Sequence, residues 1–302
     1  MNVEILDVTA RDGLQNESVM LTTEDKLSLI DKIIDAGARR LEVASFAHPK
    51  YVPQMADAEA VISGLSDRDD VQYIGLVMNE RGLDRALKTN IDEAGLVCVA
   101  TDTFAKKNQN QTRDGSVQMA ASMIQRAKTS GLSANVTIAA SLGCPFEGEV
   151  SVKTVVDMAI KLAKAGPREI SIADTIGVGN PWHVKKLLKA LKQEIPDIPF
   201  RAHFHNTRNT GLANVYAALE EGISTIDVSV GGIGGCPFAP AATGNVPAED
   251  VIYMLERNGI GTGYNLSKLI DVSKWLSEKM NKQLPAMVSR AGEFPNQNKQ
   301  AA

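Results

Sequence analysis

Short runs of apolar and β-branched residues alternate along the chain with longer amphipathic segments. Eight such runs predict strands, at residues 3–8, 40–43, 72–77, 94–99, 135–139, 169–172, 200–203 and 225–230. Segments with apolar residues at helical spacing lie between them, the clearest at residues 24–36, 117–130, 152–165, 182–193 and 212–221. This alternation of strands and helices predicts an α/β fold with a parallel sheet.

Four glycines end predicted helices shortly before the next strand: Gly37, Gly131, Gly166 and Gly222. Glycine is favoured there because it adopts the left-handed conformation that closes a helix. Eight strand–helix units without a linker rich in proline or serine predict one TIM (β/α)8 barrel over about residues 3–262, rather than two doubly wound domains. Within this single catalytic domain, residues 263–302 are expected to add a C-terminal helix, at 266–280, and a polar tail.

The charge balance argues against a nucleic-acid partner. Among 302 residues, 32 are Lys or Arg and 36 are Asp or Glu, which gives a net charge of −4. No stretch reaches the ~18 apolar residues of a membrane span. Asp7, Arg11 and Asp12 interrupt the apolar start of the chain, where a signal peptide would have to continue. We therefore expect a cytoplasmic protein with no nucleic-acid or membrane partner.

The three cysteines, Cys98, Cys144 and Cys236, are far apart and odd in number, which predicts free thiols rather than disulfides or paired zinc ligands. Cys98 lies within a predicted strand and is expected to be buried and inert. Cys236 lies between glycines and a proline, which indicates a thiol on a shaped loop, where a reactive role is open to it. For Cys144 both interpretations stay open. The surrounding glycines lack the spacing of a nucleotide-binding loop.

Polar side chains follow the ends of several predicted strands. They are Arg11, Asp12, Glu42, Asp174, His203, His205, Asn206 and Asn245. In a TIM barrel the carboxyl ends of all eight strands open onto one rim, and active sites lie there. The sequence therefore predicts that these side chains share one site.

His203 and His205 are the most informative pair. Residues at positions i and i+2 of a strand point to the same face, so the two imidazoles converge, as metal ligands do. An isolated His-x-His pair fits two structural histidines equally well. Here the pair comprises two of only four histidines and lies at a rim that also offers Asp12, Glu42 and Asn245. Imidazole, carboxylate and amide oxygen together suit Mg²⁺ or Mn²⁺, so we predict a catalytic divalent cation.

The same residues fit other interpretations. A zinc hydrolase would need further imidazoles, but His48 and His183 fall outside the predicted strand ends. Arg11 beside Asp12 forms either a surface ion pair or a group that stabilises an oxygen anion, and its place at the rim favours the second. Asp174 either faces the substrate or caps the turn that follows it.

Five segments, in colinear order, resemble the 3-hydroxy-3-methylglutaryl-CoA lyase family of the DRE-TIM metallolyases: residues 11–17 (RDGLQNE), 49–55 (PKYVPQM), 143–148 (GCPFEG), 174–179 (DTIGVG) and 232–238 (GIGGCPF). The similarity extends from residue 3 to about residue 280. The resemblance implies a TIM barrel that tends to form a homodimer. It also implies metal-dependent cleavage of a carbon–carbon bond in a 3-hydroxyacyl-CoA thioester, to acetyl-CoA and a keto acid.

The resemblance also assigns roles to residues. Four side chains occupy the positions of the family's metal ligands: Asp12, His203, His205 and Asn245. By the same resemblance Arg11 stabilises the enolate, and Cys236 is a catalytic thiol on a lid loop. Glu42 and Asp174 are implied to support the metal and substrate region. His203 is the best candidate for moving the proton of the substrate hydroxyl, or for positioning it.

Three departures from the family pattern affect the predicted substrate. Asn206 and Arg208 follow the histidines where the family has Asp and Tyr, and Thr137 stands at the place of a family tyrosine. We expect these side chains around the acyl group of the substrate. That substrate is 3-hydroxy-3-methylglutaryl-CoA or a relative such as citramalyl-CoA. Lys50 and Asn108 are candidates for contacts with the CoA portion.

Two rival functions stay open. One is a condensing synthase of the same superfamily, although such chains usually carry a further C-terminal domain. The other is a barrel that binds CoA esters without catalysis, against which the complete ligand set argues.

Overall fold

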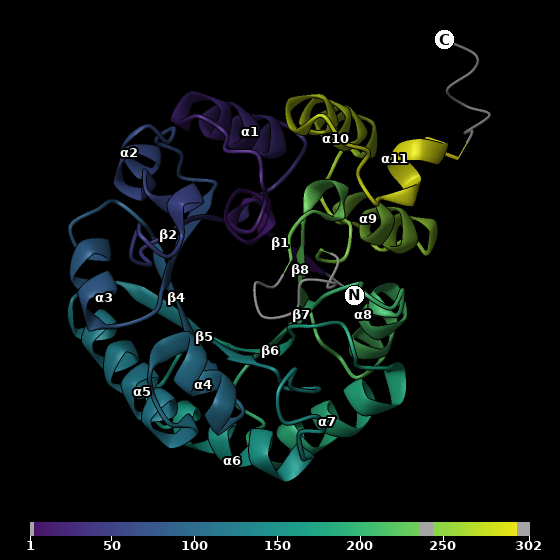
Figure 1. Cartoon of the computed structure of the whole chain (residues 1–302). Coiled ribbons are helices and arrows are strands. Elements are labelled where there is room, and N and C mark those ends of the chain that lie inside the picture. The colour runs from purple at the N-terminus through teal and green to yellow at the C-terminus, as the bar shows by residue number, and fades with distance from the viewer. Residues whose placement is uncertain (1–2, 236–243, 295–302) are drawn as a thin grey trace.

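The eight predicted apolar runs form eight parallel strands that close into a barrel in sequential order. The computed structural model describes residues 3–235 and 244–294. The strands are β1 Glu4–Asp7, β2 Arg40–Ser45, β3 Gln72–Val77, β4 Glu93–Val99, β5 Ser133–Ala139, β6 Ile170–Asp174, β7 Phe200–Phe204 and β8 Thr225–Val228. Figure 1 looks into the barrel, with the helices arranged around the strands. The predicted TIM barrel is confirmed.

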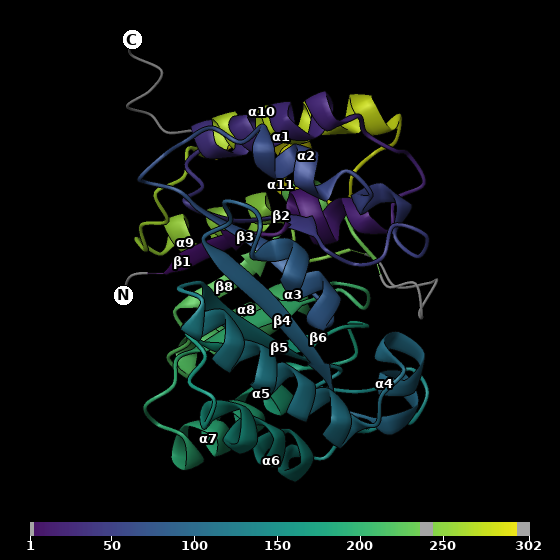
Figure 2. The ribbon, with the colours of Figure 1, turned by 90° about the vertical axis from the view of Figure 1, so that its left-hand side faces the viewer.

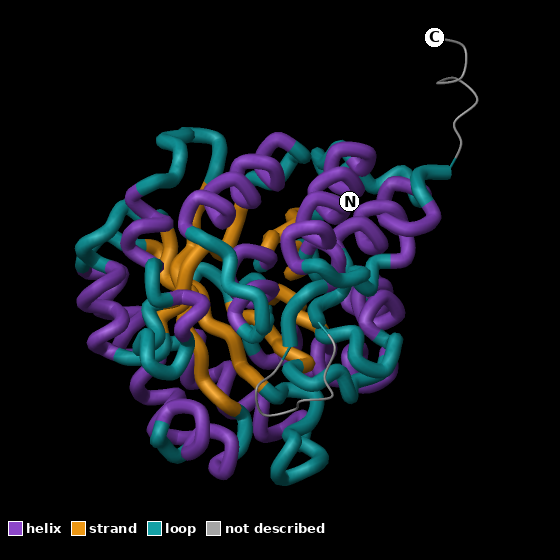
Figure 3. Tube along the Cα trace, turned by 45° about the horizontal axis from the view of Figure 1, so that its top comes forward, coloured by secondary structure: helices purple, strands orange, loops and turns teal. Residues whose placement is uncertain are grey.

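Helices follow the strands and cover the outside of the barrel, as Figure 3 shows. They are α1 Thr23–Asp35, α2 Ala58–Ser63, α3 Glu80–Ala86, α4 Asp102–Gln109, α5 Arg113–Thr129, α6 Val152–Ala163, α7 Pro181–Glu194, α8 Gly211–Glu220, α9 Ala248–Arg257, α10 Leu266–Met280 and α11 Met287–Ala291. The five helices predicted most clearly are confirmed within a few residues. None of the helices in the described ranges has the length and apolar character that a membrane crossing needs.

Local sequence explains where these helices begin and end. The side chains of Thr22 and Asn180 accept hydrogen bonds from the first backbone amides of α1 and α7. The four glycines predicted to close helices all have positive φ: Gly37, Gly131, Gly166 and Gly222. Gly37 has φ +123°, and a Cβ there would lie 2.4 Å from a backbone oxygen of the loop before α10, so only glycine fits.

The C-terminal segment packs onto the first helix. Figures 1 and 2 show α10 beside α1, and Asn265 at the start of α10 donates a backbone hydrogen bond to Ala36 O at 2.7 Å. The additional helix predicted at residues 266–280 is therefore confirmed. The short helix α11 follows α10. Asp250 of α9 accepts hydrogen bonds from the first two backbone amides of α11, those of Met287 and Val288.

The barrel interior contains buried charged side chains. Buried ion pairs lie near the amino ends of the strands, where Arg40 contacts Glu93 at 2.8 Å and Glu169 at 2.7 Å. Apolar side chains fill the space between strands and helices, and a small cluster of Leu6, Val8 and Ile74 lies apart from them. The candidate site lies at the opposite end of the barrel, on the rim formed by the carboxyl ends of the strands.

Candidate metal centre

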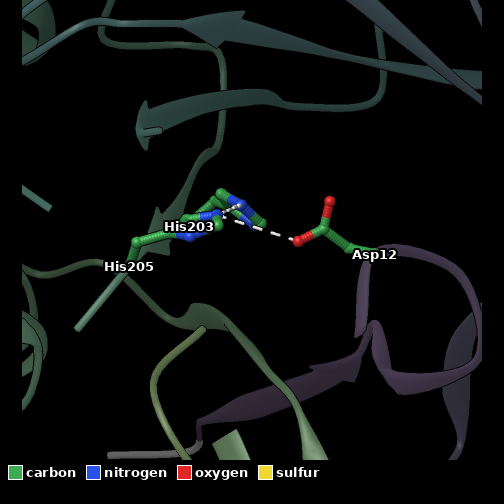
Figure 4. Close-up of side chains that lie close together, drawn as sticks. All are labelled: Asp12, His203 and His205. Atoms are coloured by element: carbon green, nitrogen blue, oxygen red, sulfur yellow. Dashed lines mark hydrogen bonds and ion pairs between the residues drawn. The ribbon is translucent and has the colours of Figure 1, made fainter. Parts of the chain in front are cut away.

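Asp12, His203 and His205 meet at the rim of the barrel. Their ligand atoms all lie within 4.8 Å of one another, and all three residues are buried. The two Nε2 atoms are 3.2 Å apart, and His205 Nε2 is 3.7 Å from Asp12 Oδ2. Figure 4 shows the carboxylate facing the imidazoles. The side chains come from opposite ends of the sequence, so only closure of the barrel brings them together.

A π-helical turn, Thr9–Gly13, carries Asp12 into this position directly after β1. Thr9 Oγ1 accepts a hydrogen bond from Val230 N at 2.8 Å, which ties the turn to the segment after β8. Gly13 packs so closely that a Cβ would lie 2.9 Å from Ile233 Cγ1. Both contacts hold the turn against the segment after β8, across the seam between the first and last strands.

Asn245 lies beside the same cluster. It forms an antiparallel bridge with His205, and its Nδ2 donates hydrogen bonds to Asp12 Oδ2 at 2.8 Å and to Ile233 O at 3.2 Å. Its Oδ1 is buried and has no hydrogen-bond partner within the described ranges. A buried acceptor without a partner costs about 1–3 kcal/mol. A cation at the cluster would satisfy that oxygen, so the residues fit a divalent metal.

Arg11 joins the cluster to a second carboxylate. Its Nη1 donates to Asp12 Oδ1 at 2.6 Å, and its Nε donates to Glu42 Oε2 at 2.6 Å. Burial alone would raise the pKa of Asp12, but Arg11, His203 and His205 outweigh it and hold that pKa well below its usual range. Asp12 is thus a carboxylate at neutral pH. Burial raises the pKa of Glu42, although Arg11 opposes the shift.

An open cavity of about 150 Å³ lies over these groups. The predicted residues in its wall are Arg11, Asp12, Glu42, Asn108, Thr137, His203 and His205. The wall also contains Arg201 and Asp227, which were not among the predicted site residues. The sequence does mark both residues, because each is a charged residue inside an otherwise apolar predicted strand. Such a residue is expected to face a polar part of the barrel interior.

Three predicted substrate residues lie elsewhere in the described part of the chain. Asn206 Oδ1 accepts a hydrogen bond from Gly211 N at 2.9 Å, at the start of α8. Arg208 Nη1 donates to two backbone oxygens in the turn after β6, at 3.2 and 3.0 Å. Lys50 is exposed in the loop before α2. The first two side chains support loops at the rim, and contact of any of the three with a substrate stays a prediction.

Asp174 has the capping geometry that the sequence left open. Its Oδ1 and Oδ2 accept hydrogen bonds from Val178 N and Gly179 N, both at 2.9 Å. Burial raises its pKa, and these backbone hydrogen bonds oppose the shift. The described lining of the cavity does not include this carboxylate. Asp174 therefore holds the loop after β6, and its predicted part in the metal and substrate region stays a prediction.

The cysteines divide into two groups. Cys98 and Cys144 are buried free thiols, and burial raises the pKa of Cys98 to about 12, as expected for an inert side chain. Cys144 Sγ lies 3.0 Å from Thr101 Oγ1. Cys236 lies outside the described residues. The residue before it, Gly235, lines the cavity, and its carbonyl oxygen accepts a hydrogen bond from Asn16 Nδ2 at 2.7 Å.

Comparisons with known proteins place the chain among lyases that act on CoA thioesters. The HMGL-like family matches residues 2–276. The hydroxymethylglutaryl-CoA lyase of Bacillus subtilis is 40% identical over 94% of this chain and 95% of its own. The (R)-citramalyl-CoA lyase of Chloroflexus aurantiacus is 39% identical over 96% of this chain and 95% of its own.

A solved structure extends the likeness to three dimensions. An HMG-CoA lyase from Acinetobacter baumannii, in complex with coenzyme A and 3-methylmalate, superposes with a TM-score of 0.92 at 35% identity, covering 98% of this chain and 96% of that one. Together with the sequence matches, this likeness confirms the predicted resemblance and the class of enzyme, a carbon–carbon lyase. The chain belongs to the HMGL-like family.

Proposed function

We propose that this protein is a divalent-metal-dependent lyase that splits a small 3-hydroxyacyl-CoA thioester into acetyl-CoA and a keto acid. The observation that carries the proposal is the cluster of Asp12, His203 and His205 in the wall of an open cavity, with Arg11 beside it. The first candidate substrate is 3-hydroxy-3-methylglutaryl-CoA. The alternatives are citramalyl-CoA, or a condensing reaction of the same superfamily.

The residues that would hold the cation are Asp12, His203, His205 and Asn245. When bound, Mg²⁺ or Mn²⁺ would lower the pKa of the substrate's 3-hydroxyl and orient its oxygens. The unpartnered Asn245 Oδ1 supports this ligand set because the cation would supply its missing partner. The mixture of oxygen and imidazole ligands, without a thiolate, favours Mg²⁺ or Mn²⁺ over a structural zinc.

Charge in the cavity supports an anionic substrate. Among its described lining residues are two arginines and three carboxylates, so with neutral imidazoles this part of the wall carries one net negative charge. A divalent cation would turn this into one net positive charge. The carboxylate of a 3-hydroxyacid would then be attracted, and so would the negative charge that develops on the thioester oxygen.

Arg11 is positioned to stabilise that developing charge. In the proposed reaction the 3-hydroxyl gives its proton to water in the open cavity, C3 becomes a carbonyl carbon, and the C2–C3 bond breaks. The electron pair of that bond forms the enolate of acetyl-CoA, and C2 is then protonated. Glu42 and Asp12 hold the guanidinium from two sides, so Arg11 offers a fixed planar charge in the cavity wall. The predicted source of the proton for C2 is Cys236.

The structure supports a positioning role for His203 rather than proton transfer. Its Nδ1 lies 3.0 Å from Asp227 Oδ2, and its Nε2 faces the ligand cluster. With both ring nitrogens engaged, the imidazole has no free atom with which to take the substrate's proton.

The alternative substrate is favoured by one feature of the wall. Thr137 Oγ1 accepts a hydrogen bond from Arg201 Nη2 at 3.2 Å, where the family pattern has a tyrosine. A small hydroxyl beside a buried guanidinium offers recognition of a carboxylate close to the reacting carbon. Citramalyl-CoA has such a carboxylate, because its carboxylate is attached directly to C3.

The test is a panel of acyl-CoA thioesters assayed with metal-stripped protein. We expect release of acetyl-CoA from one of the two candidate substrates only after Mg²⁺ or Mn²⁺ is restored. Asp12→Asn should abolish turnover, whereas the matched surface change Asp157→Asn on α6 should leave it unchanged. Metal-independent cleavage, or no cleavage of either thioester, would overturn the proposal. Condensation of acetyl-CoA with a 2-keto acid would favour the synthase instead.

The homodimer and the cytoplasmic location stay predictions. Light scattering of the purified protein would measure the first, and fractionation of cells that express it would test the second.

A further inference from the structure

Asp227 is a buried carboxylate on β8 that contacts the metal centre through His203. Its Oδ2 lies 3.0 Å from His203 Nδ1, and its side chain is 3% exposed. A carboxylate only accepts hydrogen bonds, so in this pair Nδ1 of a neutral imidazole must carry the ring proton. Nε2 is then left without a hydrogen, as an atom that binds a cation must be.

Arg201 faces the other oxygen of the same carboxylate. It precedes His203 by two residues on β7, so both side chains point into the barrel. Its Nε lies 3.2 Å from Asp227 Oδ1, and its Nη1 donates to Glu169 Oε1 at 3.1 Å. The Arg201 side chain is 6% exposed. Asp227 therefore stands between two groups, an imidazole and a guanidinium, that both need an acceptor.

We propose that Asp227 and Arg201 act as a positioning pair that fixes His203 in the tautomer with its proton on Nδ1, and so prepares Nε2 to bind the cation. The inference rests on the metal centre of the proposed function and adds to it the source of the ligand's orientation. Arg201 matters because its positive charge sets the orientation of the side chain at position 227.

The asymmetry of an amide makes this testable. The two oxygens of a carboxylate are equivalent and both negative, so Asp227 presents one to His203 and the other to the guanidinium, at ion-pair distance but without hydrogen-bond geometry. In Asp227→Asn the amide has one acceptor and one donor, and the positive Arg201, which can only donate, attracts the oxygen and repels the NH₂. The amide NH₂ then points at His203 Nδ1 and drives the ring proton to Nε2, where it blocks the cation.

The experiment measures the affinity of metal-stripped protein for Mn²⁺, with free Mn²⁺ followed by electron paramagnetic resonance. Asp227→Ala is the matched control, because it removes the same charge but leaves both tautomers open. We expect Asp227→Asn to bind Mn²⁺ more weakly than Asp227→Ala by about tenfold or more. An Asn variant that binds as tightly as the Ala variant, or more tightly, would overturn the inference.

A double variant isolates the part of Arg201. When Arg201→Met is added to Asp227→Asn, nothing holds the amide oxygen, and it is free to accept from His203 Nδ1. We therefore expect the double variant to bind Mn²⁺ more tightly than Asp227→Asn alone, although it carries one more change in the barrel. Equal or weaker binding would show that the guanidinium does not orient the group at position 227.

Nitrogen-15 spectra of the unaltered protein supply a measurement that does not depend on how the variants fold. Only four histidines contribute signals. At alkaline pH, His203 should show a protonated Nδ1 and an unprotonated Nε2, and the opposite pattern would overturn the tautomer assignment. If the unaltered protein bound no Mn²⁺ at all, the metal centre itself would fall, and the positioning role with it. If every variant at position 227 bound Mn²⁺ as tightly as the unaltered protein, only the positioning role would be refuted and the metal centre would stand.

Discussion

Replacing Arg11 with lysine separates the charge of this side chain from its shape. The guanidinium donates to Asp12 Oδ1 and to Glu42 Oε2, both at 2.6 Å, from different nitrogens of one rigid plane. Lysine keeps the positive charge, so attraction of an anionic substrate into the cavity should persist. Its single ammonium cannot span both carboxylates and still present a donor to the thioester oxygen.

The expected loss follows from the donor that is removed. One donor to a developing oxygen anion is worth about 2.7–4 kcal/mol, or a factor of about 10²–10³ in kcat. Because the lost contact strengthens mainly in the transition state, kcat should fall by this amount while KM changes little. Asp12 remains a carboxylate, so the affinity for Mn²⁺ should stay close to that of the unaltered protein.

The assay measures kcat and KM for acetyl-CoA release at saturating Mg²⁺, with thermal melting and Mn²⁺ affinity recorded for the same preparation. Arg11→Met, which removes the charge as well, should raise KM in addition to lowering kcat. An Arg11→Lys variant with nearly unaltered kcat would refute the argument that Arg11 stabilises the enolate. A loss of activity that only mirrored a loss of metal would refute it equally.

Three further predictions concern a proposed metal ligand, a buried acid and a turn. Asn245→Ala should weaken Mn²⁺ binding by about tenfold or more, because it removes the unpartnered oxygen that is proposed to bind the cation. Unchanged affinity in the Mn²⁺ titration would contradict the assignment of Asn245 as a ligand. Burial raises the pKa of Asp7 from 3.8 to about 7. The folded chain therefore binds more protons than the unfolded chain between these values, and stability should fall by up to about 4 kcal/mol as the pH rises through this window. Asp7→Asn should accordingly raise the melting temperature at pH 8 more than at pH 4, and a reversed difference would contradict the burial argument. Gly37→Ala should cost about 2–4 kcal/mol of unfolding free energy, because strain at positive φ adds to a collision with backbone. Gly259→Ala, with a positive φ but open space around it, is the control in denaturant titrations and should cost less.

The chain's local patterns determined the barrel and the core of its site. Strand and helix periods are properties of neighbouring residues, so eight strands and the longer helices were predictable. The spacing of His203 and His205 placed both imidazoles on one face, and the rule that barrel sites lie at strand ends brought Asp12 to them. The helices α2 and α3 were not predicted, because six or seven residues are too few to display a helical period.

Tertiary structure alone decided which polar side chains serve the cavity and which serve the loops. Asp174, Asn206 and Arg208 follow the strands as catalytic residues would, yet their polar atoms pair with backbone groups of adjacent turns. Asp227 and Arg201 sit inside strands and reach the site from within. The physical reason is that hydrogen bonds form with whatever atoms closure of the barrel brings within about 3 Å. The partners of Arg208, Arg201 and Asp227 come from other strands and loops, so their positions are set by the registers of the closed sheet. Asp174 and Asn206 instead pair with backbone amides four or five residues further along the chain, in loops whose shape the closed barrel fixes.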